Sequence, residues 1–201
     1  MATSRAATVH DLPGIYRVCL RTGLAGGDAG HLHDDPDLLG HVWAGAYAVF
    51  PGSATRVVHD DTGVAGYCIA VPDTAAFDDW LERVWLPPLR ERYPRGSGTT
   101  VADRALVERL HLTPVSDAAR LEQYPAHLHI DLLPRLQGQG WGRRILTEVL
   151  DGLAGAGVGG VHLGVDAANV AAHGFYERLG FSLLDIAPGV RFYGIRLPAR
   201  T

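Results

Sequence analysis

The chain has 201 residues, 47% of them hydrophobic, which is enough for one domain with a substantial core and short for two. Its 22 acidic residues outnumber 18 basic residues, all of them arginine, and at a net charge of −4 no basic stripe is available to meet a nucleic-acid backbone. No apolar run approaches the roughly 20 residues of a membrane span, and the N-terminus lacks the apolar core of a signal peptide, so we expect a single cytoplasmic domain, 1–201.

The first third of the chain alternates short β-rich and helical runs. A strand is followed by a helix with proline in its first turn, and then by a helix with apolar residues at helical spacing. The turn sequence HDDTG joins two β-branched runs as a hairpin. The predicted elements are strand 3–9, helices 11–20 and 37–46, and strands 54–59 and 64–71.

The segment 74–125 predicts a helical and loop insertion between the third and fourth strands. Thr74 is expected to cap the first helix of this insertion, and the pair Pro87-Pro88 should interrupt that helix. A glycine-rich loop precedes the next helix. The insertion is expected to contain helix 75–85, its continuation over 89–93, helix 102–110 and an irregular connection, 113–125.

The last third alternates strand and helix, which implies at least two parallel strands flanked by antiparallel hairpins and therefore the α/β class. The final strand is apolar and is a candidate for pairing between two copies of the chain in a homodimer. The predicted elements are strands 128–133, 161–165, 181–186 and 190–197, and helices 140–155 and 169–179.

A glycine-rich turn separates strand 128–133 from helix 140–155. At such a junction several backbone amides lack intrahelical partners and the helix dipole presents its positive end, so the turn is a candidate anion site. Arg143 stands where the dinucleotide fingerprint needs a glycine, and no Lys-Ser/Thr follows as in a P-loop. The turn consists of Gln137, Gly138, Gln139, Gly140, Trp141 and Gly142.

A second motif, N-x-x-A-x-x-F-Y-x-x-x-G-F, runs from Asn169 to Phe181. With the turn Q-x-x-G-x-G one helix and one strand earlier, it resembles the two signatures of the GNAT acyltransferases, which bind acetyl-CoA. The resemblance implies the GNAT fold, a mixed and mostly antiparallel sheet flanked by helices. In that fold the fourth and fifth strands are parallel and splay apart to admit the cofactor.

Four shorter blocks are similar to the acetyltransferase-like domain at the C-terminus of O-GlcNAcase and to its stand-alone bacterial relatives. This resemblance covers nearly the whole chain, the insertion included. The eukaryotic domain lacks the glycine turn and is regarded as a pseudo-acetyltransferase, whereas this chain keeps Gly138, Gly140 and Gly142, so cofactor binding is expected here. The blocks are residues 16–23, 36–39, 63–67 and 124–125.

The GNAT resemblance implies how the cofactor is bound. The backbone of Leu132 and Leu133 would pair with the pantetheine arm, and the amides of residues 137–142 would bind the pyrophosphate. Asn169 would hydrogen-bond the cofactor, although a simple helix N-cap is an alternative for this residue, and both roles are compatible.

Within the turn, Gly140 and Gly142 are expected to be the positions least able to accept a Cβ. Arg143 and Arg144 begin the helix that follows. One of them could reach a phosphate group, and an exposed pair that only solvates the helix is the alternative.

Tyr176 is the residue that the family pattern assigns to protonation of the leaving thiolate. The alternative is a half-buried aromatic residue that packs beside Phe175 and Phe181. A variant that keeps the ring and removes the hydroxyl separates the two.

A general base is harder to identify. His127, His129 and Asp131 alternate with apolar residues and share one face of their strand. If that face borders the acceptor cleft, these side chains supply the base, and a solvent-facing stripe is the alternative. Asp166 is a further candidate. The histidine spacings lack a third clustered ligand, so we predict no metal.

The predicted function is transfer of the acetyl group of acetyl-CoA to an amine by direct attack in a ternary complex. Neither motif places a Cys or Ser beside a His and an acid, so nothing indicates an acyl-enzyme. The amine acceptor, a small molecule or a peptide, is open. The alternatives are a cofactor-binding or protein-interaction module without transferase activity, and a transferase for a longer acyl-CoA.

Overall fold

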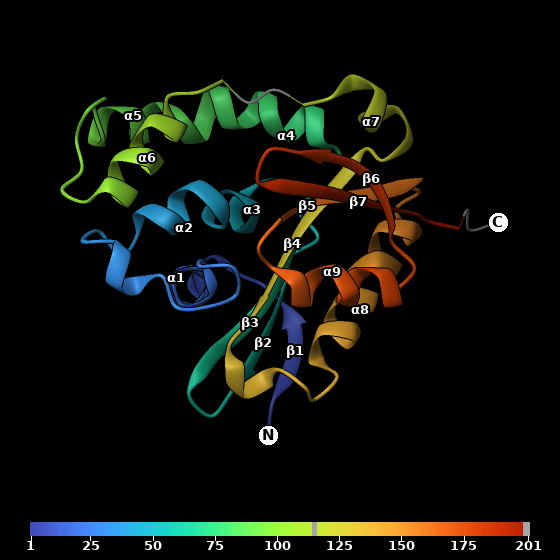
Figure 1. Cartoon of the computed structure of the whole chain (residues 1–201). Coiled ribbons are helices and arrows are strands. Elements are labelled where there is room, and N and C mark those ends of the chain that lie inside the picture. Colours follow the sequence, from blue (N-terminus) through green and yellow to red (C-terminus); the bar gives the residue numbers. More distant parts are fainter. Residues whose placement is uncertain (114–115, 199–201) are drawn as a thin grey trace.

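A computed structural model describes residues 1–113 and 116–198. Its strands form a single seven-stranded sheet of order β1-β2-β3-β4-β5-β7-β6, in which β4 and β5 are parallel and all other neighbours are antiparallel (Figure 1). The strands are β1 (Thr3–Ala6), β2 (Arg56–Asp60), β3 (Gly63–Val71), β4 (Ala126–Leu132), β5 (Gly160–Asp166), β6 (Ser182–Ala187) and β7 (Val190–Arg196). The predicted mixed α/β sheet is confirmed.

Helices cover both faces of this sheet. The helices are α1 (Leu12–Thr22), α2 (Leu38–Trp43), α3 (Gly45–Val49), α4 (Thr74–Trp80), α5 (Leu86–Arg92), α6 (Val101–Leu110), α7 (Ala118–Gln123), α8 (Trp141–Gly155) and α9 (Val170–Arg178). Figure 1 shows α1 to α3 on one side of β4, α8 and α9 on the other, and the α4–α7 insertion along the top of the view. Every residue of β3 except Gly63 is buried, because both faces of this central strand are covered.

The predicted helix 37–46 is wrong in one respect, because it is broken into α2 and α3 at Ala44 (φ −136°, ψ −44°). Gly40 and Gly45 lie so close to Tyr16 that a Cβ would come within 2.5 and 2.3 Å of its side chain. The chain bends around the tyrosine ring, a tertiary contact that helical spacing does not encode.

The prediction that Pro87 and Pro88 interrupt the helix is wrong. Residues Leu81–Trp85 form a π-helical turn, and the Leu86 amide bonds the Leu81 carbonyl five residues back. The prolines then occupy the first turn of α5, where their missing amides are not needed.

The connection 113–125, predicted to be irregular, contains α7, whose first amides bond the side chain of Asp117. Residues 114–115 of this connection lie outside the described residues. The final strand is also placed differently from the prediction. Because β7 lies between β5 and β6, both of its edges are paired and it is not free to join a second copy. None of the described helices has both the length and the apolar character that crossing a membrane requires.

Candidate functional site

Strands β4 and β5 diverge after a short parallel contact. They pair only at Ala126 with Val161 and at His127 with His162. Beyond this point β4 stays on β3 as far as Leu132, and β5 stays on β7 as far as Asp166. One edge of β4 is therefore left without a strand partner over its last five residues, 128–132.

The register decides which backbone groups this edge presents. The Leu133 amide donates to the Ala65 carbonyl (2.9 Å), so the amide of Leu133 is already engaged with the β3 side. Because antiparallel bonding alternates, the backbone groups of Ile130 and Leu132 point the other way, toward the diverging β5. The Leu132 carbonyl accepts a hydrogen bond from the Gln137 side chain (2.9 Å).

The glycine turn follows this edge directly and opens α8. Gly138 (φ 71°) and Gly140 (φ 81°) adopt left-handed conformations that favour glycine, and a Cβ built on either residue would meet no atom within 4 Å. Within the described residues, the amides of Gly138, Gln139 and Gly140 donate none of the backbone hydrogen bonds found outside helices and strands. The amides of the first turn of α8 also lack intrahelical acceptors. The turn is thus a cradle of free N–H groups with open space in front of it.

Gly142 has a different role from Gly140. A Cβ at Gly142 would lie 3.1 Å from the ring of Phe175 and 3.6 Å from Leu132, so this glycine allows α8 and α9 to pack closely. Gly140 is restricted by its backbone angle, whereas Gly142 is restricted by its neighbours. The Gln139 side chain braces the turn by donating to the Arg135 carbonyl (2.7 Å).

The two arginines at the start of α8 are not equivalent. Arg144 bonds Glu148 (3.3 Å), and its guanidinium lies 4.8 Å from the ring centre of Trp141. Arg143 is exposed and has no ion pair or hydrogen bond with the described part of the chain. Of the two, Arg143 is the one with a free charge.

Asn169 is the N-cap of α9, because its side chain accepts a hydrogen bond from the Ala172 amide (3.2 Å). Its side-chain nitrogen would lie 3.7 Å from a Cβ built on Gly26, so the turn after α1 lies close to the start of α9. Asp166 bonds the Ala168 amide (2.8 Å) and so shapes the turn between β5 and α9.

Tyr176 is 6% exposed and packs against the rings of Phe181 and Tyr193. Burial, with a contribution from the charge of Asp131, raises the pKa of the Tyr176 hydroxyl, so the group stays protonated at neutral pH. Among residues 1–113 and 116–198 the hydroxyl has no hydrogen-bond partner, and it is not among the fully enclosed polar atoms. It is a free proton donor that reaches accessible space.

The polar stripe of β4 faces helices rather than solvent. Asp131 accepts a hydrogen bond from the Tyr67 hydroxyl (2.6 Å), and burial raises the pKa of this carboxyl. Burial lowers the pKa of His127 well below its usual value, and burial together with the charge of Arg109 lowers the pKa of His129 to about 4. Both histidines are therefore neutral at physiological pH.

A chain of hydrogen bonds assigns the tautomers of these two histidines. The Thr74 hydroxyl donates its one proton to the Pro125 carbonyl (2.7 Å). Its oxygen must therefore accept the hydrogen bond that it shares with His127, from Nδ1–H of that ring (2.8 Å). His127 Nε2 then accepts from the Tyr47 hydroxyl (2.6 Å), and the Tyr47 oxygen accepts from Nε2–H of His129 (2.9 Å).

The end of this chain is the unprotonated Nδ1 of His129. This atom has no hydrogen-bond partner in the described chain and is not fully enclosed. It is the one ring nitrogen of the two histidines that this network, formed by Thr74, His127, Tyr47 and His129, leaves without a partner. The arrangement can accept a proton at a defined atom beside the diverging strands.

Sequence reasoning missed Tyr47 and Thr74 in these roles. The prediction that Thr74 caps α4 is wrong, because the side chain of Asp73 accepts the hydrogen bond from the Ala76 amide instead (3.0 Å). The Thr74 hydroxyl is thereby free for Pro125 and His127. Either residue of the pair Asp73-Thr74 could cap the helix by sequence alone, and no local signal indicates that Thr74 contacts His127, 53 residues away.

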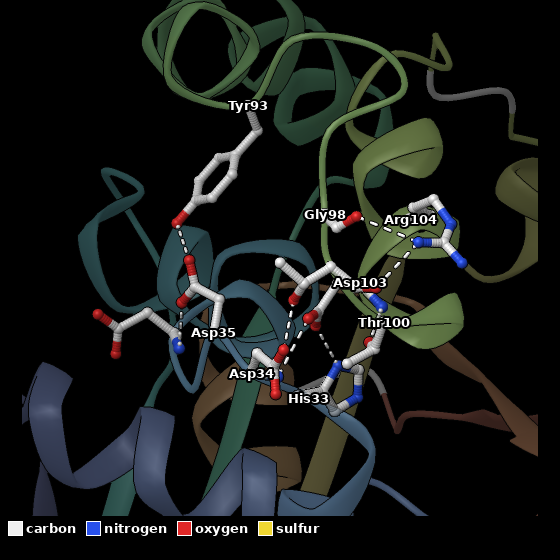
Figure 2. Close-up of polar contacts among 10 residues, drawn as sticks. His33, Asp34, Asp35, Tyr93, Gly98, Thr100, Asp103 and Arg104 are labelled. Carbon is white, nitrogen blue, oxygen red and sulfur yellow. Dashed lines mark hydrogen bonds and ion pairs between the residues drawn. The ribbon is translucent and has the colours of Figure 1, made fainter.

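The insertion is held against the turn after α1 by a buried polar cluster (Figure 2). His33 bonds Asp103 (2.7 Å), and these side chains are only 5% and 2% exposed. The amide of Asp34 bonds the same carboxylate (3.1 Å), and Tyr93 bonds Asp35 (2.8 Å). These contacts hold α5 and α6 against the segment between α1 and α2.

Comparison with known proteins gives a consistent result. The Acetyltransferase (GNAT) family matches residues 75–181. The crystal structure of SsHAT is 32% identical in sequence and superposes with a TM-score of 0.86, covering 98% of both chains.

More distant proteins share the fold. A putative acetyltransferase from Salmonella typhimurium, yncA, solved with acetyl-CoA, is 18% identical with a TM-score of 0.57, covering 100% of this chain and 96% of that one. Protein O-GlcNAcase of Mus musculus is 21% identical over 186 residues, which are 89% of this chain. The chain spans about a fifth of the length of that protein, since 20% of it is matched.

Proposed function

Because the chain belongs to the acetyltransferase (GNAT) family, we propose that it transfers an acetyl group from acetyl-CoA to an amine by direct attack in a ternary complex. The observation that carries the proposal is the glycine turn at the divergence of β4 and β5. Its free amides, left-handed glycines and open space fit a pyrophosphate. His129 belongs to the part of β4 that has no partner on the β5 side, and Tyr176 lies on α9, the helix that follows β5.

Different residues would bind different parts of the cofactor. The amides of residues 138–142 and the positive end of α8 would hold the pyrophosphate, with Arg143 free to pair with a phosphate. Leu132 would pair its backbone with the pantetheine arm. The Leu133 amide is engaged, so it would support this contact from the β3 side.

Two groups would handle the protons of the transfer. As the amine nitrogen bonds the carbonyl carbon and the carbon–sulfur bond breaks, Nδ1 of His129 accepts the proton of the amine, directly or through water. Tyr176 donates its proton to the departing sulfur. His127 and Tyr47 position His129, and Asp131 is the alternative base, to be compared with His127 and His129 through single variants and their pH–rate profiles.

Calorimetric titration with acetyl-CoA tests the binding site. Wild-type protein should bind with saturation, and Gly140→Glu should lose binding, because it strains the backbone and places a carboxylate where phosphate would sit. Gly157→Glu is the matched control: Gly157 has the same φ of 81° and the same open surroundings, at the other end of α8. Equal affinities of the two variants would contradict the proposed site.

A second candidate is an acetyl-CoA-binding or protein-interaction module without transferase activity. It is favoured by the pKa of His129, which at about 4 makes the imidazole a weak base for an amine. Release of CoA in the presence of amines, measured with a thiol reagent, separates the two. Binding without amine-dependent release supports the module.

A further inference from the structure

Arg109 on α6 carries a positive charge that no acidic side chain neutralises. Its guanidinium carbon lies 4.1 Å from the ring centre of Trp43, and it forms no hydrogen bond or ion pair with the described residues. Arg92 likewise has only a ring contact, with Tyr93, whereas two other arginines of the insertion are engaged. Arg90 is paired with Glu82, and Arg104 bonds the carbonyls of Gly98 and Thr99.

The contact with Trp43 leaves the binding edges of Arg109 free. An aromatic ring occupies one face of a guanidinium and attracts its charge, while the N–H groups project in the plane. Two parallel N–H groups match the two oxygens of a carboxylate or phosphate. Arg109 as a whole residue is exposed, and partial burial of its guanidinium lowers the pKa of this group, which stays charged at neutral pH.

Arg109 and His129, whose Nδ1 is proposed to accept the proton, both contact Trp43. Trp43 packs edge-on against His129, with ring centres 6.2 Å apart. The charge of Arg109 is the largest contribution after burial to the low pKa of His129. The position of α6 is fixed by the buried bond between His33 and Asp103 (Figure 2).

We infer that the amine acceptor carries an oxyanionic group, a carboxylate or a phosphate, which Arg109 binds while stacked on Trp43. This inference rests on the proposed acetyl transfer to an amine. The oxyanion would offset the charge of Arg109 and so raise the pKa of His129 when the acceptor is bound. Binding of the correct acceptor would thereby strengthen the base that deprotonates it.

Pairs of amines that differ only in the anionic group test this inference. The probes are the α-amino acids, each with its α-amide, and phosphoethanolamine with ethanolamine, assayed by CoA release from acetyl-CoA. The wild-type protein should acetylate at least one anionic amine with a kcat/KM at least tenfold above that of its neutral partner. The amine of an α-amide is less basic than that of the amino acid, so more of it is unprotonated at neutral pH, which by itself would favour the neutral partner. The amino acid pairs test for a carboxylate, and the phosphoethanolamine pair tests for a phosphate.

Variants then locate the effect. Arg109→Met should abolish the preference, Arg109→Lys should keep part of it, and Arg104→Met on the same helix should leave it unchanged. Calorimetric affinity for acetyl-CoA should stay the same in all three. A preference that survives in Arg109→Met, or equal turnover within every pair, overturns the inference and leaves the proposed function intact.

Three further results complete the test. If the wild-type protein does not bind acetyl-CoA, or releases no CoA in response to any amine, the result would count against the proposed function itself. Turnover of neutral amines alone would overturn only the role of Arg109. An acid limb of the pH–rate profile that moves upward in Arg109→Met supports the inference, because removing a positive charge raises the pKa of His129.

Discussion

The cofactor half and the acceptor half of the proposed site are built in different ways. The cofactor half, formed by the end of β4, the glycine turn and the starts of α8 and α9, presents mainly backbone groups. Two left-handed glycines and a run of free amides define it. The acceptor half presents side chains from four separate elements: Tyr47 of α3, Thr74 of α4, Arg109 of α6 and His129 of β4.

This difference determines how each half responds to mutation. A backbone cradle is changed mainly by residues that alter φ or fill space, so it tolerates most substitutions nearby. A side-chain network depends on each donor and acceptor, since an unpaired buried polar group is costly. We therefore expect acceptor-side variants to alter turnover and leave acetyl-CoA affinity unchanged.

Tyr47→Phe should have the largest effect. The change removes the donor to His127 and the acceptor for His129, so Nδ1 of His129 is no longer the defined proton acceptor. We expect turnover to fall about 100-fold, with acetyl-CoA affinity unchanged. In the wild-type protein this base is lost as the pH falls through about 4, where His129 becomes protonated.

Tyr16→Phe is the control for Tyr47→Phe. Tyr16 forms a similar bond with His41 (2.9 Å) in the same helical layer, away from β4. It should keep wild-type turnover. Equal losses in the two variants would mean that the effect is one of general stability, and the distinction between the halves would fail.

Asp103→Asn should have the next largest effect, on stability. It removes a buried charge-assisted bond to His33, and we expect the free energy of unfolding in urea to fall by about 2 kcal/mol. Burial alone would raise the pKa of Asp103, but hydrogen bonds from His33 and the Asp34 amide lower it overall. The stabilisation is present above the ordinary carboxyl pKa and is lost as the pH falls through the lowered value, a loss that Asp103→Asn should not show. An unchanged unfolding free energy at neutral pH would remove this cluster from the account of how α6 is held.

Tyr176→Phe should lower turnover about tenfold and leave the affinity for acetyl-CoA nearly intact, because the ring still packs against Phe181 and Tyr193. Tyr193→Phe removes a neighbouring buried hydroxyl that bonds His173 (3.3 Å), and should affect stability without affecting turnover. Steady-state kinetics and calorimetry on both variants provide the measurement. Wild-type turnover in Tyr176→Phe would end its assignment as the proton donor.

Asp11→Asn should have the smallest effect and calibrates the others, because it lies outside both halves. Hydrogen bonds from Arg5, opposed by burial and assisted by Thr8, lower the pKa of Asp11 from 3.8 to about 2. The pair stabilises the fold above pH 3.8 by about 1 kcal/mol, since Arg5 is 44% exposed, and this is lost as the pH falls through about 2. Acid titration of unfolding should show this loss in wild-type protein and in Asp61→Asn, whose carboxylate is exposed, but not in Asp11→Asn.

Most of the sheet and the cofactor half could be predicted from local pattern. The order of elements from β4 to β7, the parallel contact and the glycine turn follow from apolar runs, glycine positions and the Asn169 cap. The errors lie where distant contacts decide. Tyr16 bends the chain at Ala44, a π-helical turn accommodates Pro87 and Pro88, and β6 covers the edge of β7.

The sequence by itself determined that a glycine turn with free amides joins a strand to a helix, because a positive φ at Gly138 and Gly140 and free amides at a helix start are local properties. Only the tertiary structure decided that His129, rather than His127, keeps a free ring nitrogen and that Arg109 has no acidic partner. The tautomer of His129 depends on Thr74, His127 and Tyr47, which meet through the β3–β4 register and the packing of α3 and α4. Arg109 is free because no carboxylate from any described element reaches it, a property of the assembled fold that no spacing in the chain encodes.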